Sequence, residues 1–290
     1  MDYEGFIIRP PSEAYSLLLQ VTLGCSHNKC GFCATYGQKK FKIKSLEIIK
    51  KDLREASNYK GVEKVFLCDG DALIIPQQRL EEILQLINQS LPGIERIGTY
   101  ANAKSILKKS VDDLKKLKEM GLKIIYLGVE TGSVHLLEKI NKGVTYKQMV
   151  DAGRRVKDAG ITLSVTVLLG IGGKEKSAEH ASDTAKILTE IDPDYVGALT
   201  LMLVPGTRLY DDYRGGRFVL PDKFGFIQEL NLMIANSEFT NCYFTSNHAS
   251  NYLPIKAYLP RQKEEVLKAI RSVFENKDDS RMRPEYLRGL

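Results

Sequence analysis

The chain has 290 residues, of which 43% are hydrophobic and 27% are charged, as is ordinary for a soluble globular protein. Its formal net charge of +6 is small and spread along the chain, so composition does not support nucleic-acid binding. No apolar run approaches the roughly 20 residues that cross a bilayer. The first residues, MDYEGFIIRPPSEAYS, do not form a signal peptide. We therefore expect a cytoplasmic protein with no membrane partner.

Short apolar runs rich in β-branched residues alternate with longer amphipathic patterns along most of the chain. The expected strands are, in chain order, Tyr15–Thr22, Lys64–Cys68, Arg96–Tyr100, Lys123–Val129, Thr162–Leu169 and Tyr195–Leu203. The helices expected between them are Ser45–Ser57, Gln77–Ser90, Val111–Met120, Tyr146–Ala159 and Ser177–Glu190. Because these strands are almost continuously apolar, we expect them to be buried on both faces in a parallel sheet.

The β/α pattern ends before the last quarter of the chain. Its six units satisfy either an open doubly wound sheet or a partial barrel, so the fold class is α/β. Beyond it, helices are expected near Asp222–Asn236 and Arg261–Glu275, with the irregular stretch FTNCYFTSNHASNYLP between them. We predict an N-terminal extension over residues 1–14, a core over 15–215 and a C-terminal accessory segment over 216–290.

Three of the five cysteines lie together, immediately after the first expected strand. Cys25, Cys30 and Cys33 fall within nine residues, and three thiolates at that spacing favour a soft metal. A structural zinc site needs a fourth ligand, and His27 lies inside the short Cys25–Cys30 loop, where it would strain the site. A [4Fe–4S] cluster on three thiolates instead leaves one iron open. The spacing therefore favours a reactive iron–sulfur site at a strand end, where α/β folds place their chemistry.

The cysteine loop, C-x4-C-x2-C with Phe32 before the last cysteine, resembles that of the radical S-adenosylmethionine (SAM) superfamily. The usual pattern there is C-x3-C-x2-C, so this loop has one extra residue between its first two cysteines. The resemblance implies a (β/α)6 partial TIM barrel with a small, mostly helical C-terminal extension. It also implies that Cys25, Cys30 and Cys33 hold a [4Fe–4S] cluster and that Phe32 lies beside the cofactors.

Polar and glycine residues follow the next two expected strands. Cys68-Asp69-Gly70-Asp71-Ala72 is similar to the Gly-Gly-Glu motif of the superfamily, which implies that Gly70, Asp71 and Ala72 hold the SAM amino group. Glycine lets the backbone approach a ligand, and a carboxylate accepts hydrogen bonds from an ammonium group. Asn102 follows the third strand and is expected at the same edge of the sheet.

Later segments extend the resemblance. Gly-Val-Glu-Thr-Gly-Ser followed by Ile-Asn-Lys-Gly-Val-Thr is similar to a segment of the coproporphyrinogen-oxidase-like, Elongator-like and methylthiotransferase-like branches. The similarity implies that Glu130 lies near the SAM ribose and that Lys142 replaces an arginine near the methionine carboxylate, without its bidentate fork. Gly170, Gly172 and Pro205 stand in segments similar to those that frame the adenine. The exact member is not identified.

The resemblance implies an enzyme that cleaves SAM reductively to methionine and a 5′-deoxyadenosyl radical, which abstracts hydrogen from an unidentified substrate. A flavodoxin or ferredoxin type reductant is the implied partner. The four lysines of Gly37–Lys44 form either a solvated loop or a docking patch for an acidic reductant. His248, in a polar stretch near the C-terminus, is the candidate catalytic acid or base.

Two other functions remain open on the sequence. A zinc-stabilised RNA-binding module would use the thiols structurally, and it predicts no iron, no acid-labile sulfide and no affinity for SAM. A non-catalytic relative would keep the scaffold to carry a cluster or haem, and it would not cleave SAM.

Overall fold

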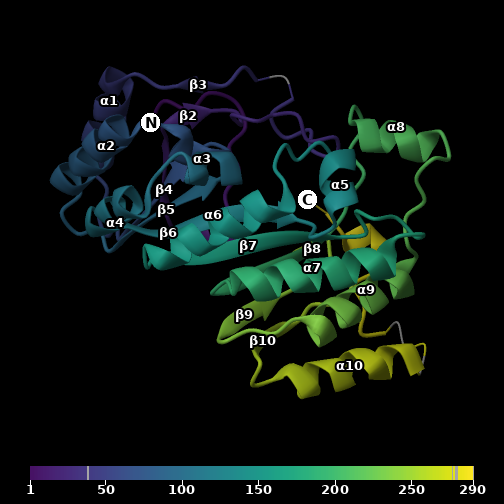
Figure 1. Cartoon of the computed structure of the whole chain (residues 1–290). Helices are drawn as coiled ribbons and strands as arrows, with labels where there is room; N and C mark the ends of the chain where they lie inside the picture. The colour runs from purple at the N-terminus through teal and green to yellow at the C-terminus, as the bar shows by residue number, and fades with distance from the viewer. Residues whose placement is uncertain (38, 276, 278–279, 290) are drawn as a thin grey trace. The chain divides into compact units, whose positions relative to one another are not determined.

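A computed structural model describes residues 1–37, 39–275, 277 and 280–289 of the chain (Figure 1). The chain folds as two compact units. The first comprises Met1–Asn28, Thr35–Leu127 and Asp151–Leu163, and the second comprises Lys29–Ala34, Gly128–Val150 and Ser164–Leu290. The predicted division into 1–14, 15–215 and 216–290 follows sequence pattern instead and stays a prediction.

The first unit is built on parallel strands in the order β1, β4, β5, β6. These strands are Leu17–Gln20, Lys64–Cys68, Arg96–Ala101 and Leu122–Glu130, the last of which continues into the second unit. The short strands β2 and β3, Thr22–Leu23 and Lys42–Ile43, pair antiparallel to each other. Four residues of β4 are fully buried, which agrees with a strand covered on both faces.

The helices α1, α2, α3 and α4 of the first unit are Leu46–Ala56, Gln77–Ser90, Ala103–Leu107 and Val111–Glu119. The helices α1, α3 and α4 begin at a capping side chain, and α2 begins after a proline. Ser110 and Asp113 form a reciprocal capping box at the start of α4, and Pro76 directly precedes α2. Helix α2 packs against both α1 and α4.

The second unit carries parallel strands β7, β8 and β9, with β10 antiparallel to β9. Their bounds are Thr162–Leu169, Tyr195–Thr200, Cys242–Thr245 and Lys256–Leu259. The helices α5, α7, α8, α9 and α10 are Val134–Lys139, Ser177–Ile191, Arg208–Arg214, Lys223–Asn236 and Lys263–Glu275. Helix α9 packs against both α7 and α10 (Figure 1). Helix α6, Tyr146–Asp158, runs from the second unit into the first.

The predicted α/β fold class is confirmed, because helices follow strands β1, β4, β5, β6, β7 and β8 in turn and the sheet is mostly parallel. The C-terminal segment is mostly helical, as predicted, but it also contributes β9 and β10, which the sequence analysis placed in irregular or unassigned chain. Within the described residues, none of the helices combines the length and apolar character that a bilayer crossing requires.

Candidate functional site

The turn that carries Cys30 and Cys33 is held by backbone hydrogen bonds inside the second unit. The Cys33 amide donates to the Cys30 carbonyl at 3.2 Å, which closes the turn. Between them, the Gly31 amide donates to the Ile140 carbonyl at 2.8 Å, and the Gly31 carbonyl accepts from the Leu209 amide at 2.9 Å. Both cysteines are therefore fixed by their neighbours to the end of α5 and to the start of α8.

The three clustered cysteines differ from the other two in solvent access. Cys33 is exposed and Cys25 and Cys30 are half-buried, whereas Cys68 and Cys242 are fully buried. Burial raises the pKa of the Cys68 thiol, which disfavours the thiolate that binds metal. The three clustered thiols have the solvent access that a metal-binding thiolate needs, and their predicted role as cluster ligands stays a prediction. Cys25 belongs to the first unit, and Cys30 and Cys33 belong to the second.

Phe32 stands between these two cysteines and packs on an apolar cluster of the second unit. The buried members of that cluster are Leu136, Ile140, Leu168, Ile171, Leu201, Leu209 and Phe218. The aromatic residue of the motif therefore also anchors the turn. Its predicted position beside the cofactors stays a prediction.

Asp71 is the centre of a buried polar network in the first unit. Its Oδ2 atom accepts hydrogen bonds from the hydroxyls of Ser26 and Ser105 and from Asn102 Nδ2, the last at 2.7 Å. Its Oδ1 atom accepts from the Asn102 amide at 3.3 Å. The structure thus brings together the predicted residues Asp71 and Asn102 and ties both to Ser26, which directly follows Cys25. Ala72, also fully buried, begins the next helical turn.

The network predicts a pH dependence of stability. Burial raises the pKa of the Asp71 carboxyl to about 6 from its ordinary 3.8, against the opposing hydrogen bonds. The pKa of Asp71 is higher in the folded protein than in the unfolded chain, so protonation of Asp71 stabilises the fold. This stabilisation is complete below pH 3.8 and is lost as pH rises through about 6. A pKa that is higher by about 2 in the folded state corresponds to about 3 kcal/mol of unfolding free energy. The difference in unfolding free energy between wild type and Asp71→Asn, from urea titrations, should therefore change across this range; a constant difference would contradict it.

Asp69, which the sequence analysis did not single out, has an open acceptor. Its side chain is fully buried, and its Oδ1 atom has no hydrogen-bond partner among the described residues. The Oδ2 atom accepts from Gln20 Nε2 at 3.0 Å and lies 3.7 Å from Lys39 Nζ. Burial raises the pKa of the Asp69 carboxyl. A buried carboxylate oxygen without a partner is costly, which makes Asp69 a candidate to receive a cationic group.

Gly70 adds a steric constraint to the same turn. A Cβ atom placed there would lie 2.5 Å from Cε2 of the Tyr36 ring, so the backbone turn and the ring touch only because the residue is glycine. Burial also raises the pKa of the Tyr36 hydroxyl, which stays protonated and available as a donor. Gly70 is therefore needed for packing, and its predicted contact with SAM stays a prediction.

Glu130 and Lys142, both predicted from the later motif, are brought together in the second unit. Lys142 Nζ lies 2.8 Å from Glu130 Oε1, and both side chains are nearly nine-tenths buried. A Cβ atom at Gly128 would lie 2.2 Å from that Oε1 atom, which explains the glycine two residues before Glu130. The two side chains therefore form a largely buried ion pair. The predicted roles at the ribose and the carboxylate stay predictions.

A second buried network, not predicted from the sequence, holds the Gly170 loop that follows β7. The Gly170 amide donates to Glu229 Oε1 at 2.6 Å, and the Ser177 hydroxyl donates to Glu229 Oε2. His180 Nε2 lies 3.3 Å from the same Oε1 atom, and both side chains are fully buried. Glu229 comes from α9, so the carboxylate connects the C-terminal segment to a loop of the predicted SAM site.

Gly172 and Pro205, also predicted at the adenine, lie in different surroundings. A Cβ atom at Gly172 would lie 3.1 Å from the His180 Cβ atom, so this part of the loop is tightly packed. Pro205 is exposed in the turn before α8, where Thr207 caps the helix through the Tyr210 amide at 3.2 Å. Neither contact tests the predicted role at the adenine.

Two glycines with nearly the same positive φ provide a matched pair of variants. Gly170 and Gly206 have φ of +83° and +84°, but a Cβ atom at Gly170 would lie 2.2 Å from Phe226 Cε1, and one at Gly206 meets nothing within 4 Å. We expect Gly206→Ala to lower the unfolding free energy by about 1 kcal/mol, from backbone strain alone. Gly170→Ala should lower it by about 2–4 kcal/mol because the clash adds to the strain. Equal losses in urea unfolding would contradict this packing.

His248 lies in a loop of the second unit, and its described contacts do not include another predicted site residue. Its Nδ1 atom accepts hydrogen bonds from the Ser250 amide at 3.1 Å and pairs with the Ser250 hydroxyl at 2.9 Å. Burial and the charge of Arg283 lower the pKa of the imidazole. The ring is therefore neutral near pH 7 with its proton on Nε2. Its role as a catalytic acid or base stays a prediction.

Most lysines of the run after the cysteine loop make hydrogen bonds or ion pairs with the N-terminal segment. Lys44 is fully buried and donates to the Asp2 carbonyl, and Lys39 Nζ donates to the Phe6 carbonyl at 2.6 Å. Lys42 pairs with Glu4 at 2.9 Å. Gln38, within this run, lies outside the described residues. The hypothesis of a four-lysine docking patch is therefore wrong for Lys39 and Lys44, whose ammonium groups fasten the N-terminal segment.

Comparison with known proteins places the chain in a family. The family model described as "Radical SAM superfamily" matches residues 19–187, which is more than half of the chain. The chain is 26% identical over 196 residues to an uncharacterized methyltransferase of Pyrococcus horikoshii, covering 67% of this chain and 41% of that one. It is 26% identical over 162 residues to the heme chaperone HemW of Bacillus subtilis, covering 55% of this chain and 42% of that one.

Among solved structures, methylornithine synthase superposes with a TM-score of 0.54 at 21% identity, covering 77% of this chain and 63% of that one. This likeness confirms the predicted fold, which is the α/β fold of radical SAM partial barrels. The chain spans less than half the length of the two relatives named above. With the family match and the fold in agreement, the chain belongs to the radical SAM superfamily.

Proposed function

We propose that this protein binds a [4Fe–4S] cluster through Cys25, Cys30 and Cys33 and uses it to cleave SAM reductively. The cluster and SAM are the cofactors of its superfamily. Held by these three thiolates, the cluster would supply the electron for reductive cleavage of SAM to methionine and a 5′-deoxyadenosyl radical, which would take a hydrogen atom from the substrate. The chain's own residues bind and orient these groups and exclude water.

The observation that carries the proposal is the link between the cysteine loop and the strand ends in the first unit. Ser26, the neighbour of Cys25, donates to Asp71, and Asp71 accepts from Asn102. Three loops, which follow β2, β4 and β5, are thereby joined at one buried carboxylate. Two of these loops lie at the carboxyl ends of the parallel strands β4 and β5, where α/β folds typically bind their ligands.

Asp69 is our candidate for the group that receives the SAM ammonium. Its Oδ1 atom is buried without a described partner, whereas both oxygens of Asp71 already accept hydrogen bonds. Binding a cation beside Asp69 would offset the cost of the buried charge. Asp71 then acts mainly by positioning the loops, and the two roles make different predictions for their asparagine variants.

The electron is expected to come from a flavodoxin or ferredoxin type reductant. These carriers are acidic, and docking to them is an electrostatic effect that falls with ionic strength. Lys40 and Lys42 are the exposed lysines that remain from the proposed docking patch once Lys39 and Lys44 are assigned to the fold. Lys42 also pairs with Glu4.

The test is anaerobic reconstitution followed by incubation with SAM and dithionite, with 5′-deoxyadenosine measured by chromatography. Iron and acid-labile sulfide near four per chain together with deoxyadenosine formation would support the proposal. Tightly held zinc without sulfide would instead support the zinc-stabilised RNA-binding module.

A second candidate is favoured by the similarity to the heme chaperone HemW. In that case the chain would carry a cluster or haem and would not turn over SAM. The same incubation, repeated with haem added, separates the two. A carrier would bind the cluster or haem stoichiometrically and form no deoxyadenosine, even with an excess of reductant.

A further inference from the structure

Two buried side chains of the second unit, His180 and Glu229, together contact the two loops that are predicted to hold the adenosine part of SAM. Glu130, predicted near the ribose, ends β6, and Gly170, predicted near the adenine, directly follows β7. His180 comes from α7 and Glu229 from α9, and both side chains are fully buried. Neither residue has a role in the proposed SAM cleavage.

Helix α9 holds the loop after β7 through two side chains. The Gly170 amide donates to Glu229 Oε1 at 2.6 Å, and the Ser177 hydroxyl donates to Glu229 Oε2. Phe226, one turn earlier on the same helix, leaves no space for a side chain at Gly170, because a Cβ atom there would lie 2.2 Å from Phe226 Cε1. A hydrogen bond and an aromatic ring from one helix therefore fix the position of Gly170.

The His180 ring joins this contact to the loop after β6. Its Nε2 atom lies 3.0 Å from the Leu168 carbonyl oxygen and 3.3 Å from Glu229 Oε1. Because a carbonyl oxygen only accepts hydrogen bonds, Nε2 carries a proton. The Nδ1 atom lies 2.9 Å from the Thr131 hydroxyl and 3.2 Å from the Thr184 hydroxyl. One imidazole ring thus contacts the end of β7, the carboxylate from α9 and the turn that follows β6.

The turn after β6 is also held directly against α7. The Gly132 amide donates to the Thr184 hydroxyl oxygen at 3.0 Å, and the Ser133 amide donates to the Thr131 hydroxyl oxygen at 3.0 Å. A Cβ atom at Gly132 would overlap the Asp183 carbonyl, so the turn touches the helix backbone only because this residue is glycine. Both threonines are fully buried, so solvent does not compete for these hydrogen bonds.

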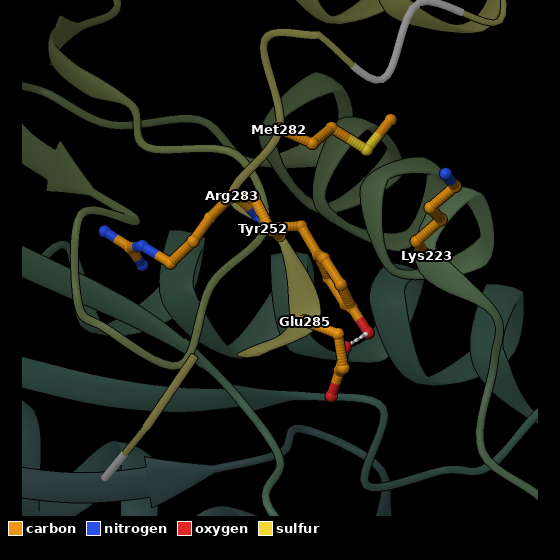
Figure 2. A pocket seen from close by; sticks show the side chains of 6 residues that line it. Lys223, Tyr252, Met282, Arg283 and Glu285 are labelled. Carbon is orange, nitrogen blue, oxygen red and sulfur yellow. Dashed lines mark hydrogen bonds between the residues drawn. The ribbon is translucent and has the colours of Figure 1, made fainter. Parts of the chain in front are cut away.

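Contacts with the last described residues support α9. The Phe226 and Tyr252 rings lie 5.8 Å apart between their centroids. The Tyr252 hydroxyl donates to Glu285, as Figure 2 shows, and the Arg288 guanidinium lies 4.0 Å from the centre of the Tyr252 ring. The C-terminal segment therefore supplies the helix that carries the buried carboxylate and also residues that pack against that helix.

We propose that His180, Thr184 and Glu229, which we call the clamp, are positioning residues that hold the two loops at the separation that the adenosine part of SAM requires. They act through the backbone of Gly170 and Gly132, and loops that are already ordered lose less conformational entropy when they bind a ligand. This inference rests on the proposed function, because only SAM binding gives the two loops an adenosine to hold. Glu229 lies beyond residues 19–187, which match the family model, so the C-terminal segment completes this site.

The first test compares the clamp carboxylate with a buried carboxylate elsewhere. Glu229→Leu removes the acceptor of the Gly170 amide, whereas Glu229→Gln keeps one oxygen that can accept this hydrogen bond. Glu13→Leu is the matched control, because Glu13 is also fully buried and accepts from Arg96 and Tyr126, which are not predicted site residues. Dissociation constants are measured on full-length, cluster-reconstituted protein for SAM and for 5′-deoxyadenosine and methionine, which carry its two halves.

We expect Glu229→Leu to bind SAM and 5′-deoxyadenosine at least about tenfold more weakly, because the Gly170 loop is no longer fixed. Its affinity for methionine should stay within about twofold of that of the wild type, since the clamp does not hold that half of SAM. Glu229→Gln should stay within about threefold of the wild type for all three ligands. Glu13→Leu should lower the urea midpoint of unfolding and leave the three affinities unchanged.

An unchanged affinity for 5′-deoxyadenosine in Glu229→Leu, or equal losses for 5′-deoxyadenosine and methionine, would overturn the proposal. The same losses in Glu13→Leu would also overturn it, because a general loss of stability would then explain them. Deoxyadenosine formation by the wild type is measured in parallel and tests the proposed function separately. A wild type that forms deoxyadenosine, together with unchanged affinities in Glu229→Leu, would contradict the clamp alone.

A second pair of variants makes a smaller change in the same network. Thr184→Val removes the hydroxyl that contacts the Gly132 amide and His180. Thr189→Val is its control on the same helix, because the Thr189 hydroxyl accepts from the Glu238 amide at 2.9 Å, which belongs to neither loop. We expect 5′-deoxyadenosine to bind about fivefold more weakly to Thr184→Val and with unchanged affinity to Thr189→Val. Equal affinities in the two variants would overturn the proposal, even if Glu229→Leu does not fold.

Discussion

Replacing Cys30 by alanine is expected to abolish deoxyadenosine formation, with a loss of at least about 100-fold, because a cluster held by three thiolates has no spare protein ligand. Cys30 closes the turn to Cys33, and both belong to a loop anchored at Gly31. Iron content after reconstitution should fall well below four per chain. The measurement is iron and sulfide analysis together with the chromatographic assay for deoxyadenosine.

Cys242→Ala is the matched control, because that thiol is fully buried in β9. It should lower the unfolding free energy by about 1–2 kcal/mol through lost packing and leave iron per folded chain unchanged. If Cys242→Ala depletes iron as strongly as Cys30→Ala does, the assignment of the accessible cysteines as the ligands is contradicted.

Asp69→Asn is expected to weaken SAM binding by about 10–100-fold, which is the loss of a charge-assisted hydrogen bond of about 1.5–3 kcal/mol. The substitution is nearly isosteric, and it removes the charge from the carboxyl group whose Oδ1 atom has no described partner. The measurement is equilibrium binding of SAM to the reconstituted protein, together with its iron content, which should stay near four per chain.

Asp71→Asn separates the two aspartates. Its carboxylate is already engaged by Ser26, Asn102 and Ser105, so its replacement should change the pH dependence of unfolding more than the affinity for SAM. If Asp71→Asn weakens SAM binding tenfold or more while Asp69→Asn leaves it unchanged, Asp71 is the ammonium acceptor and our assignment of Asp69 is wrong.

The β/α core was predictable because its signals are local. The apolar run Lys64–Cys68 agrees with β4 residue for residue, and the amphipathic pattern after Pro76 gave α2 with its observed bounds. The strand expected over Tyr15–Thr22 is interrupted at Val21, whose amide donates to the Cys68 carbonyl. Such a break depends on a partner far away in the chain and has no local signal.

Strands β9 and β10 were missed for a related reason. Each has four residues, and the alternation of buried and half-buried positions in Cys242–Thr245 is too short to distinguish from a turn-rich segment. Their pairing is set by the register that places Tyr243 beside both Tyr195 and Tyr258. Cross-strand aromatic packing of this kind stabilises a sheet but is visible only after the strands are paired.

The candidate site shows the same division between local and distant information. The motifs predicted which turns carry polar residues, and the structure joins Asp71 to Asn102 and Glu130 to Lys142. The sequence motifs did not predict that the Asp69 Oδ1 atom would lack a described hydrogen-bond partner. Whether a buried oxygen finds a partner depends on groups from several loops. Glu229 lies in the C-terminal segment, and only the fold brings its carboxylate to the Gly170 amide.

The most direct test of the central proposal is electron paramagnetic resonance of the reduced, reconstituted protein before and after SAM is added. Three thiolate ligands leave one iron open, so SAM should bind at that iron and shift the g values of the reduced [4Fe–4S] signal. The shift should disappear in Cys30→Ala because the cluster is lost. A full cluster signal in the wild type that SAM leaves unchanged, at concentrations that saturate binding, would contradict the proposal.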